Sequence, residues 1–338
     1  MKIIVDAMGG DKAPGEIVSG ALRAANESGV EIVLCGRGED ILRVIEGMGL
    51  GELPRGIEIV DASEVIDMND DPANAVRLKK DSSLAVAFGL LRDGRGDALV
   101  SAGSTGAILS GATLIVKRVR GVRRAALAPV IPNTNGGFVL VDCGANSECT
   151  AEYLYQFAFM GSIYAEDVLM LKTPRVGLLN NGVERTKGTP LQLETYTLLE
   201  KADQEGLINF VGNIEAKDAM KGACDVLVCD GFTGNVLLKS LEGMASLIIS
   251  ELKTIFSNNW RSKFSAVIIK KSMSELKAKM SPDSIGGTAL LGITKPVIKA
   301  HGSSDAEAIS NAVRQAAKAA ETNISSHLES IVTRMKTE

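Results

Sequence analysis

The sequence has few aromatic residues, only two histidines and no excess of basic charge. Aromatic residues make up 4% of the 338 residues, and the formal net charge is −4. Proteins that bind nucleic acid usually carry a basic balance, so this composition predicts no nucleic-acid partner. Apolar residues nevertheless reach 45%, and there are 35 glycines. This mixture favours close packing of helices on a sheet over a β-sandwich.

Long apolar runs and paired cysteines are also missing. The longest apolar stretches, such as Ile108–Val116, fall far short of the roughly 18 residues expected of a membrane-spanning helix. The chain begins with the strand-like run Met1–Asp6, so we expect no signal peptide and a cytoplasmic protein. No two cysteines have the CxxC spacing of a zinc or redox site, which predicts structural roles. The cysteines are Cys35, Cys143, Cys149, Cys224 and Cys229.

Short apolar runs rich in β-branched residues alternate with amphipathic segments along the chain. Continuous runs of this kind are typical of parallel strands buried on both faces. Helical patterns such as Pro14–Glu27 and Pro72–Leu91 lie between them. The alternation predicts a doubly wound α/β fold with a largely parallel sheet, in which the two runs joined by Pro132–Gly137 form a hairpin. The predicted strands are Ile3–Asp6, Ile32–Cys35, Ile57–Val60, Ala98–Ser101, Leu127–Ile131, Phe138–Asp142, Val176–Asn180, Ile208–Val211 and Val226–Asp230.

One region departs from this alternation. Two long helical patterns, Val236–Ile255 and Ser265–Met280, are separated by the short segment Phe256–Phe264. They predict a helical hairpin over about residues 236–282 that projects from a single domain spanning residues 1–338. The stretch from Asp305 to about Val332 predicts a final helix rich in alanine.

Clusters of glycine and small polar residues follow five of the predicted strands. Ligands of open α/β sheets bind at the carboxyl ends of strands, so these loops form the candidate site. The strongest are Ser101–Ala107 and Asp230–Asn235, because each opens a helix, and exposed N–H groups at a helix N-terminus attract anions. We favour a functional loop over an ordinary helix cap at both. Ser101–Ala107 matches neither the Walker A pattern nor GxGxxG.

The other three loops fit a ligand site and an ordinary turn equally well. Asp6–Asp11 has paired glycines that permit close backbone approach, but it also fits a tight turn. Asp142–Asn146 fits a ligand site or an Asx turn, and Asn180–Gly188 fits a cation-bearing or a solvated loop. His301 lies in a polar turn before the last helix. With no Ser-His-Asp order, nucleophile elbow or metal-ligand spacing, the sequence gives no case for a metal, a cofactor or a covalent nucleophile.

Seven short motifs run in order from the first residues to the last helix. They are Asp6–Asp11, Ser101–Ala107, Asp142–Asn146, Gln156–Gly161, Cys229–Asn235, Gly286–Gly292 and His301–Ser304. Together they resemble, over essentially the whole chain, the PlsX family, the phosphate acyltransferases of bacterial phospholipid synthesis. The chain departs from the usual family pattern at Ser104, at Ala125 and at Gly182–Arg185, so we assign no role to Glu184 or Arg185.

This resemblance implies the fold, the reaction and the partners. The fold is a three-layer α/β/α, Rossmann-like fold related to phosphotransacetylases and the isocitrate dehydrogenase group. The reaction moves a fatty acyl group from acyl carrier protein to inorganic phosphate, and a glycerol-3-phosphate acyltransferase then uses the acyl phosphate. The resemblance also implies a homodimer, no metal requirement and weak association with the inner face of the plasma membrane.

The implied reaction sets what the loops have to do. Attack of a phosphate oxygen on a thioester requires that two reactants be positioned and that an oxyanion be stabilised, and backbone N–H groups with a cation can do both. We expect Gly103–Gly106 to hold phosphate, Lys187 to supply the cation, and Asp230, Asn235 and His301 to orient substrate or move a proton. The expected substrate- and phosphate-binding residues are Asp6, Gly9, Gly10, Gly103, Ser104, Thr105, Gly106, Asp142 and Asn146.

Two surfaces are candidates for macromolecular contact. Acyl carrier protein is acidic, and Lys117–Arg124 is the densest basic run, so this run predicts a docking patch or, equally, a solvated face or dimer contact. The hairpin tip Phe256–Phe264 places Trp260 beside Arg261 and Lys263. Aromatics beside cations suit the surface of an anionic membrane, although the tip could instead pack on protein.

Two other functions stay open. One is a metal- and NAD-dependent decarboxylating dehydrogenase of related fold, for which the aspartate trio and the Tyr–Lys pair are not found. The other is a non-catalytic regulator that binds acyl carrier protein. Phosphate-dependent loss of the acyl-carrier thioester, measured without metal or NAD, separates all three.

Overall fold

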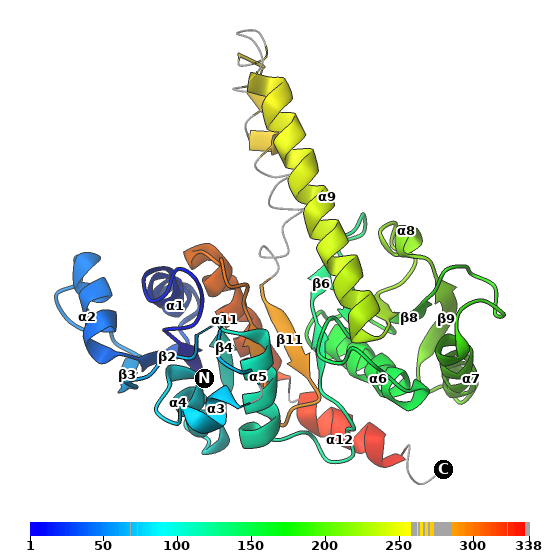
Figure 1. The fold of residues 1–338 in the computed structure, drawn as a ribbon, viewed down its shortest axis with the longest axis horizontal. Coiled ribbons are helices and arrows are strands. Elements are labelled where there is room, and N and C mark those ends of the chain that lie inside the picture. The colour runs from blue at the N-terminus through cyan, green and yellow to red at the C-terminus, as the bar shows by residue number, and fades with distance from the viewer. Residues whose placement is uncertain are drawn as a thin grey trace.

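Two neighbouring sheets with helices on both faces make up the body of the molecule, and one long helix projects from it (Figure 1). The structure is a computed structural model that describes residues 1–67, 69–72, 74–257, 262, 264–265, 268–269, 271–273, 286–322 and 324–334. Within these residues, no helix is long and apolar enough to cross a membrane.

The first sheet has seven strands in the order β3-β2-β1-β4-β12-β11-β5. All of its neighbours pair in parallel except β11, which is antiparallel to both β12 and β5. The carboxyl ends of β1, β4 and β12 therefore lie side by side at one edge. The strands are β1 (Lys2–Asp6), β2 (Glu31–Gly36), β3 (Ile57–Asp61), β4 (Ala98–Ser101), β5 (Ala126–Ala128), β11 (Thr288–Leu291) and β12 (Val297–Lys299).

The second sheet has five strands in the order β6-β7-β10-β8-β9, parallel apart from the β6–β7 pair. They are β6 (Val130–Ile131), β7 (Phe138–Val141), β8 (Arg175–Leu179), β9 (Asn209–Ile214) and β10 (Val226–Val228). The antiparallel β6–β7 pair confirms the predicted hairpin.

The prediction of one continuous strand over Leu127–Ile131 is wrong, because this run is shared between the two sheets. Pro129, which cannot donate to a strand ladder, stands at the break. The two sheets are joined there by backbone hydrogen bonds, from the Leu140 N–H to the Pro129 carbonyl at 3.0 Å and from the Cys143 N–H to the Leu127 carbonyl at 2.9 Å.

Helices cover both faces of the sheets, which confirms the predicted layered α/β fold. Alternate residues of β1 show the two faces: Ile3 and Val5 belong to one apolar cluster and Ile4 to the other. One face carries α1 (Gly15–Ser28), α2 (Gly38–Gly47), α6 (Ala151–Asp167), α7 (Pro190–Gln204), α11 (Ala306–Glu321) and α12 (Ile324–Arg334). The other carries α3 (Ala75–Leu78), α4 (Ser83–Arg92), α5 (Thr105–Gly111), the π-helical turn η1 (Ala112–Val116) and α8 (Ala216–Ala219).

Two predicted helices are each divided. Pro72–Leu91 forms α3 and α4, because the Ser82 hydroxyl accepts a hydrogen bond from the Ala85 N–H and so caps the start of a second helix. The final helix predicted from Asp305 onward is α11 and then α12, since α11 ends at Glu321 and α12 begins at Ile324.

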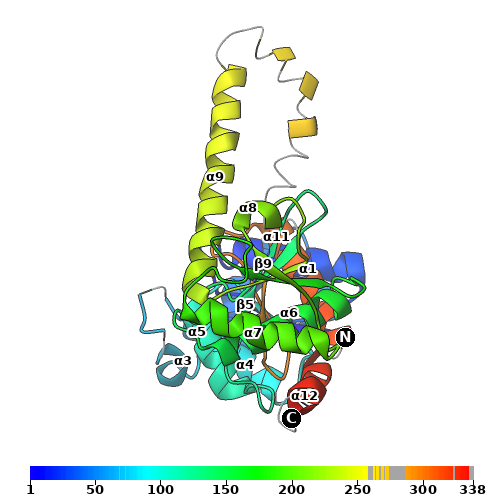
Figure 2. The ribbon, with the colours of Figure 1, turned by 90° about the vertical axis from the view of Figure 1, so that its right-hand side faces the viewer.

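The first arm of the predicted hairpin is α9 (Gly231–Ser257), which has 27 residues and is therefore about 40 Å long. It begins five residues before the predicted start at Val236, and it rises well beyond the sheets in Figures 1 and 2. Most of the predicted second arm, and the tip residues Trp260, Arg261 and Lys263, lie outside the described residues.

Candidate active site

Three loops meet at the carboxyl edge of the first sheet because β1, β4 and β12 are neighbours there. The Asp11 N–H donates to the Gly302 carbonyl at 2.8 Å, which joins the loop after β1 to the loop after β12. The Ala300 N–H donates to the Ser101 carbonyl at 2.9 Å, which joins β12 to β4. The sheet thus assembles the motifs around Asp6, Ser101 and His301.

Asp6 is buried and holds two of these loops together. Its carboxylate accepts hydrogen bonds from the Ser101 hydroxyl at 2.6 Å and from the Met8 N–H at 3.3 Å. Burial raises the pKa of Asp6, while the hydrogen bonds from Ser101 and Ser83 act in the opposite direction. With 2% of its surface exposed, Asp6 makes its contacts inside the protein, where it fixes the loop backbone.

Close backbone packing explains the glycines after β1. A Cβ built on Gly9 would lie 2.6 Å from the Asp6 Oδ2 and 2.8 Å from the Gly103 nitrogen. Gly10 has φ +102°, a conformation that side chains rarely adopt. These glycines therefore bring the first loop against the predicted phosphate loop.

The predicted phosphate loop Gly103–Gly106 runs into the start of α5. The Gly103 N–H donates to the Ser101 hydroxyl at 3.1 Å. The N–H groups that follow it in the first turn of α5 have no acceptors within the helix, so they are available to an anion. Thr105 lines the large cavity described below, whereas Ser104 is buried. A Cβ on Gly106 would lie 2.5 Å from the Pro72 Cβ, so this glycine lets the segment before α3 close over the helix start.

Asp142 plays a similar organising role in the second sheet. Its carboxylate accepts hydrogen bonds from the Leu127 N–H at 2.8 Å, from the Cys143 and Ala145 N–H groups, and from both the N–H and the side chain of Asn146. Burial raises the pKa of Asp142, and the hydrogen bonds from Leu127 and Asn146 oppose that effect. Asp142 is fully buried, so it fixes the turn that faces α9.

The loop Asp230–Asn235 forms the first turn of α9. The Asp230 carboxylate accepts from the Thr233 N–H at 2.8 Å and from the Thr233 hydroxyl at 2.7 Å, so Asp230 caps the helix. A Cβ on Gly234 would lie 2.0 Å from the Asp142 carbonyl oxygen. The helix start is thus pressed against the Asp142 turn, and Asn235 lies on the cavity wall close to Gly144.

A cavity of about 1160 Å³ lies between the strand-end loops and α9. One wall is a face of α9, on which apolar residues follow Asn235 at helical spacing. The opposite wall is the segment Pro129–Thr134 together with Met220, and the loops before β11 and after β12 complete the lining. The apolar residues of the α9 wall are Leu238, Leu241, Met244, Ala245, Ile248 and Ile249.

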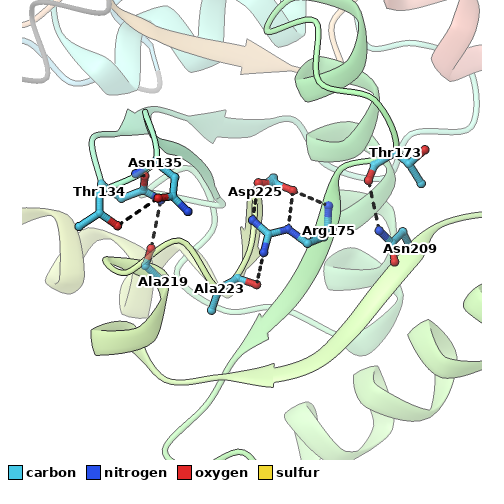
Figure 3. Close-up of polar contacts among 9 residues, drawn as sticks. Thr134, Asn135, Thr173, Arg175, Asn209, Ala219, Ala223 and Asp225 are labelled. Atoms are coloured by element: carbon cyan, nitrogen blue, oxygen red, sulfur yellow. Dashed lines mark hydrogen bonds and ion pairs between the residues drawn. The ribbon is translucent and has the colours of Figure 1, made fainter.

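The Pro129–Thr134 wall is tied to the turn at α8. The Asn133 side-chain amide donates to the Ala219 carbonyl at 3.2 Å, and the Thr134 N–H donates to the Met220 carbonyl at 3.3 Å. Figure 3 shows this corner beside a second polar cluster, in which Arg175 binds both Asp225 and the Ala223 carbonyl. The contacts of Asn133 and Thr134 hold this wall of the cavity against the turn at α8.

His301 and Ser303 both line the cavity. The Ser303 N–H donates to the His301 Nδ1 at 3.3 Å, and the Ser303 hydroxyl lies 2.9 Å from the same atom. A ring nitrogen that accepts a hydrogen bond carries no proton, so this contact places the proton of the neutral ring on Nε2. His301 can therefore offer an N–H to a ligand.

Lys187 is exposed and is not part of the cavity lining. Its loop follows β8, which is a neighbour of β10, so Lys187 belongs to the strand end beside the Asp230 loop. The Asn180 side chain donates to the Lys187 carbonyl at 3.0 Å, and the Arg185 guanidinium pairs with Glu200 at 2.7 Å.

The cavity also includes residues to which we assigned no role from the sequence. Lys299 is the main example, and Gly286, Gly287 and Thr288 line the same region. The signal that could have found Lys299 is its position at the end of a short apolar run, two residues before His301.

The fold belongs to a class, the Rossmann-like α/β proteins, that includes phosphotransacetylases of known structure. Over 95% of this chain and 94% of the other, the structure is similar to a phosphotransacetylase from Streptococcus pyogenes, with a TM-score of 0.65 and 18% identity. It is also similar to a 4-hydroxythreonine-4-phosphate dehydrogenase from Klebsiella pneumoniae, with a TM-score of 0.55 and 11% identity over 95% and 99% of the two chains. At these identities the likeness concerns the fold alone.

The sequence then gives the family. Residues 1–327 match the family model described as "Fatty acid synthesis protein". The chain is 43% identical over 329 residues to a phosphate acyltransferase from Thermoanaerobacterium thermosaccharolyticum, covering 97% of this chain and 96% of the relative. It is 44% identical over 331 residues to a phosphate acyltransferase from Bacillus licheniformis, covering 97% of each. The chain belongs to this family, the PlsX phosphate acyltransferases, and is an acyltransferase, which decides against the dehydrogenase and the non-catalytic regulator.

Proposed function

We propose that the enzyme transfers a fatty acyl group from the thioester of acyl carrier protein to inorganic phosphate, and that the acyl phosphate serves phospholipid synthesis. One observation carries the proposal. Apolar side chains from α9 alternate with polar ones along the cavity and face the apolar run Pro129–Pro132, while the polar residues Thr105, Asn235 and His301 stand where the strand-end loops meet the cavity. The apolar part suits an acyl chain, and the polar part suits the reacting thioester and phosphate.

The chemical step requires little covalent chemistry from the protein. A phosphate oxygen attacks the thioester carbon, a tetrahedral oxyanion forms, and the C–S bond then breaks with its electron pair leaving on sulfur. The N–H groups that follow Gly103 in the Gly103–Gly106 loop hold a phosphate oxygen beside the thioester carbon, and the Asn235 amide donates to the oxyanion. The Nε2–H of His301 donates a hydrogen bond to the departing thiolate, which then takes its proton from solvent.

The remaining proposed residues act around this centre. Asp230 caps α9 and so fixes the direction of Asn235, which lies one turn later. Asp6 and Asp142 hold the loop backbones from inside, with Gly9, Gly10 and Asn146 packed around them. Lys187 supplies positive charge from the neighbouring strand end when the acyl carrier is bound.

We also propose a homodimer in which α9 packs against its counterpart. This proposal is supported by large apolar side chains that α9 leaves exposed. Those that lie outside the cavity lining are Phe232, Val236, Leu247 and Ile255. Burying them would stabilise an assembly by removing apolar surface from water.

Contacts with acyl carrier protein and with the membrane complete the proposal. Lys117–Arg124 lies at the amino ends of β4 and β12, because the Val119 N–H binds the Gly292 carbonyl and Arg118 pairs with Ile293. A carrier docked on this basic run would thus sit about one strand length, roughly 15 Å, from the loops. The proposed cytoplasmic enzyme meets an anionic membrane through Phe256–Phe264, and a membrane glycerol-3-phosphate acyltransferase takes the product.

The test is turnover of acyl-acyl carrier protein in the presence of inorganic phosphate, without added metal or nucleotide. We expect loss of the thioester only when phosphate is present, and a product that hydroxylamine converts to an acyl hydroxamate. Thioester loss at the same rate without phosphate, or release of free fatty acid in place of hydroxamate, would contradict the proposal. Acyl-coenzyme A, offered in parallel, reports whether the carrier protein itself is recognised.

A further inference from the structure

We propose that Lys299 binds the phosphate substrate at the strand-end loops, an assignment that rests on the proposed acyl transfer to phosphate. Lys299 ends β12, lines the cavity together with Thr105, His301 and Ser303, and is half-buried.

Strand pairing places Lys299 beside the phosphate loop. In the parallel β12–β4 pair, Lys299 is in register with Ser101, and the Ala300 N–H binds the Ser101 carbonyl at 2.9 Å. Neighbouring strands are about 4.8 Å apart, and residues in register point to the same face of the sheet. The backbone of Lys299 thus lies one strand spacing from Ser101, the residue that leads into Gly103–Gly106.

The backbone of Lys299 is held in place from its other side. Lys299 also pairs with Thr288 of β11, and a Cβ on Gly287 would lie 2.6 Å from the Lys299 carbonyl oxygen. The Gly287 N–H donates to the Gln315 Oε1 at 2.7 Å, and the Gln315 amide donates to the Tyr164 hydroxyl at 2.7 Å. This buried chain of hydrogen bonds fixes the strands from which the ammonium group extends.

Position separates Lys299 from the other cations of the cavity. Among the described lining residues the cations are Lys239, Lys253 and Lys299. Lys239 and Lys253 both extend from α9, and Lys253 lies 18 residues after Asn235, about 27 Å further along the helix axis. Lys299 is the lining cation that extends from a strand end, in register with Ser101.

The chemistry of a lysine suits this position. An ammonium group is a compact charge with three donors, so it can stay with a phosphate oxygen while another oxygen attacks. The Lys299 Nζ now donates to the Ala300 carbonyl at 3.2 Å, a contact that keeps the side chain near the loops. Because Lys299 is half-buried, its ammonium group attracts a phosphate more strongly than a fully solvated lysine would.

The experiment compares Lys299→Met and Lys299→Arg with Lys217→Met, which removes an exposed lysine of α8 that is outside the cavity lining. For Lys299→Met we expect the KM for phosphate to rise at least about 30-fold, while the KM for the acyl thioester changes less than about threefold. Lys299→Arg should recover most of the affinity for phosphate, and Lys217→Met should match the parent. An unchanged KM for phosphate in Lys299→Met would overturn the assignment.

A second readout does not depend on turnover. Inorganic phosphate should raise the unfolding temperature of the parent and of Lys217→Met, and this rise should be lost in Lys299→Met. Unfolding temperatures without phosphate check that each variant is folded. If the parent shows no phosphate-dependent acyl transfer, the proposed function fails, whereas equal stabilisation of parent and Lys299→Met by phosphate contradicts the Lys299 assignment itself.

Discussion

The Ser101 hydroxyl donates a 2.6 Å hydrogen bond to the Asp6 carboxylate, although the two residues are 95 positions apart in the sequence. The bond joins the loops after β1 and β4 inside the protein. Ser101→Ala would leave a buried carboxylate with one donor fewer, which should cost about 1–3 kcal/mol of unfolding free energy. We also expect a higher KM for phosphate, because this bond fixes the position of the loop that begins at Gly103. Urea unfolding and phosphate titration of the variant measure both effects, and a variant with the parent's values in each would contradict this role.

The close approach of α9 to the Asp142 turn predicts different results for two glycines of the same helix. Gly234→Ala would place a Cβ 2.0 Å from the Asp142 carbonyl oxygen, so we expect a loss of about 3 kcal/mol or more and a displaced Asn235. Gly243→Ala is the matched control, since a Cβ there meets no atom within 4 Å and should be neutral or stabilising by up to about 1 kcal/mol. Equal stability of the two variants in urea would rule out this packing.

The ion pair between Arg175 and Asp225 predicts a pH-dependent contribution to stability. Burial acts to raise the pKa of Asp225, but hydrogen bonds from Arg175 outweigh it and lower the pKa. A carboxyl whose folded pKa is lowered stabilises the protein above its unfolded pKa of about 3.9 and loses that contribution as the pH falls further. Asp225→Asn should therefore lose about 1–2 kcal/mol at pH 5–7, and the difference from the parent should shrink below about pH 4.

The control for that pair is Asp93→Asn, which breaks the exposed pair of Asp93 with Arg92. Solvent screening makes such pairs weak, so no measurable change is expected. A pH-independent difference for Asp225→Asn would show that the side chain acts by packing alone.

The cysteine thiols near the cavity should be unreactive. Burial raises the pKa of Cys143, which lines the cavity, to about 12, and raises that of Cys149 to about 12 as well. Since an ordinary thiol has a pKa near 9, the reactive thiolate is about a thousandfold scarcer at neutral pH. We expect acyl transfer to survive iodoacetamide at pH 7.5, while the protein unfolded in urea labels all five cysteines. Inactivation in step with labelling of Cys143 would point to a thiol in the mechanism.

Much of the fold follows from the sequence because strand ends coincide with changes in residue type. The run Ala98–Ser101 is a strand with the predicted bounds, and the ends of β1 and β2 lie within one residue of the prediction. The sharing of Leu127–Ile131 between two sheets depends on which strands flank Pro129 in space, and local patterns do not carry that information. The strands β11 and β12 have four and three residues, too few for a periodicity to be read.

The site could be predicted at the level of loops and less well at the level of side chains. Neighbouring parallel strands bring their carboxyl ends together, which is why Ser101–Ala107 and His301 meet as motifs. A sequence does not show that Asp6 and Asp142 bind loop backbones inside the protein, or that Lys187 stands on an exposed loop while Lys299 lines the cavity. These outcomes depend on which strands become neighbours, and so on tertiary contacts.

The most direct test of the central claim uses phosphate labelled with ¹⁸O in all four positions. Attack by a phosphate oxygen on the thioester carbon predicts an acyl phosphate that retains all four labels, one of them in the bridge to the acyl group, as mass spectrometry of the product would show. An unlabelled fatty acid formed from the thioester by water, with no acyl phosphate detected, would contradict the account.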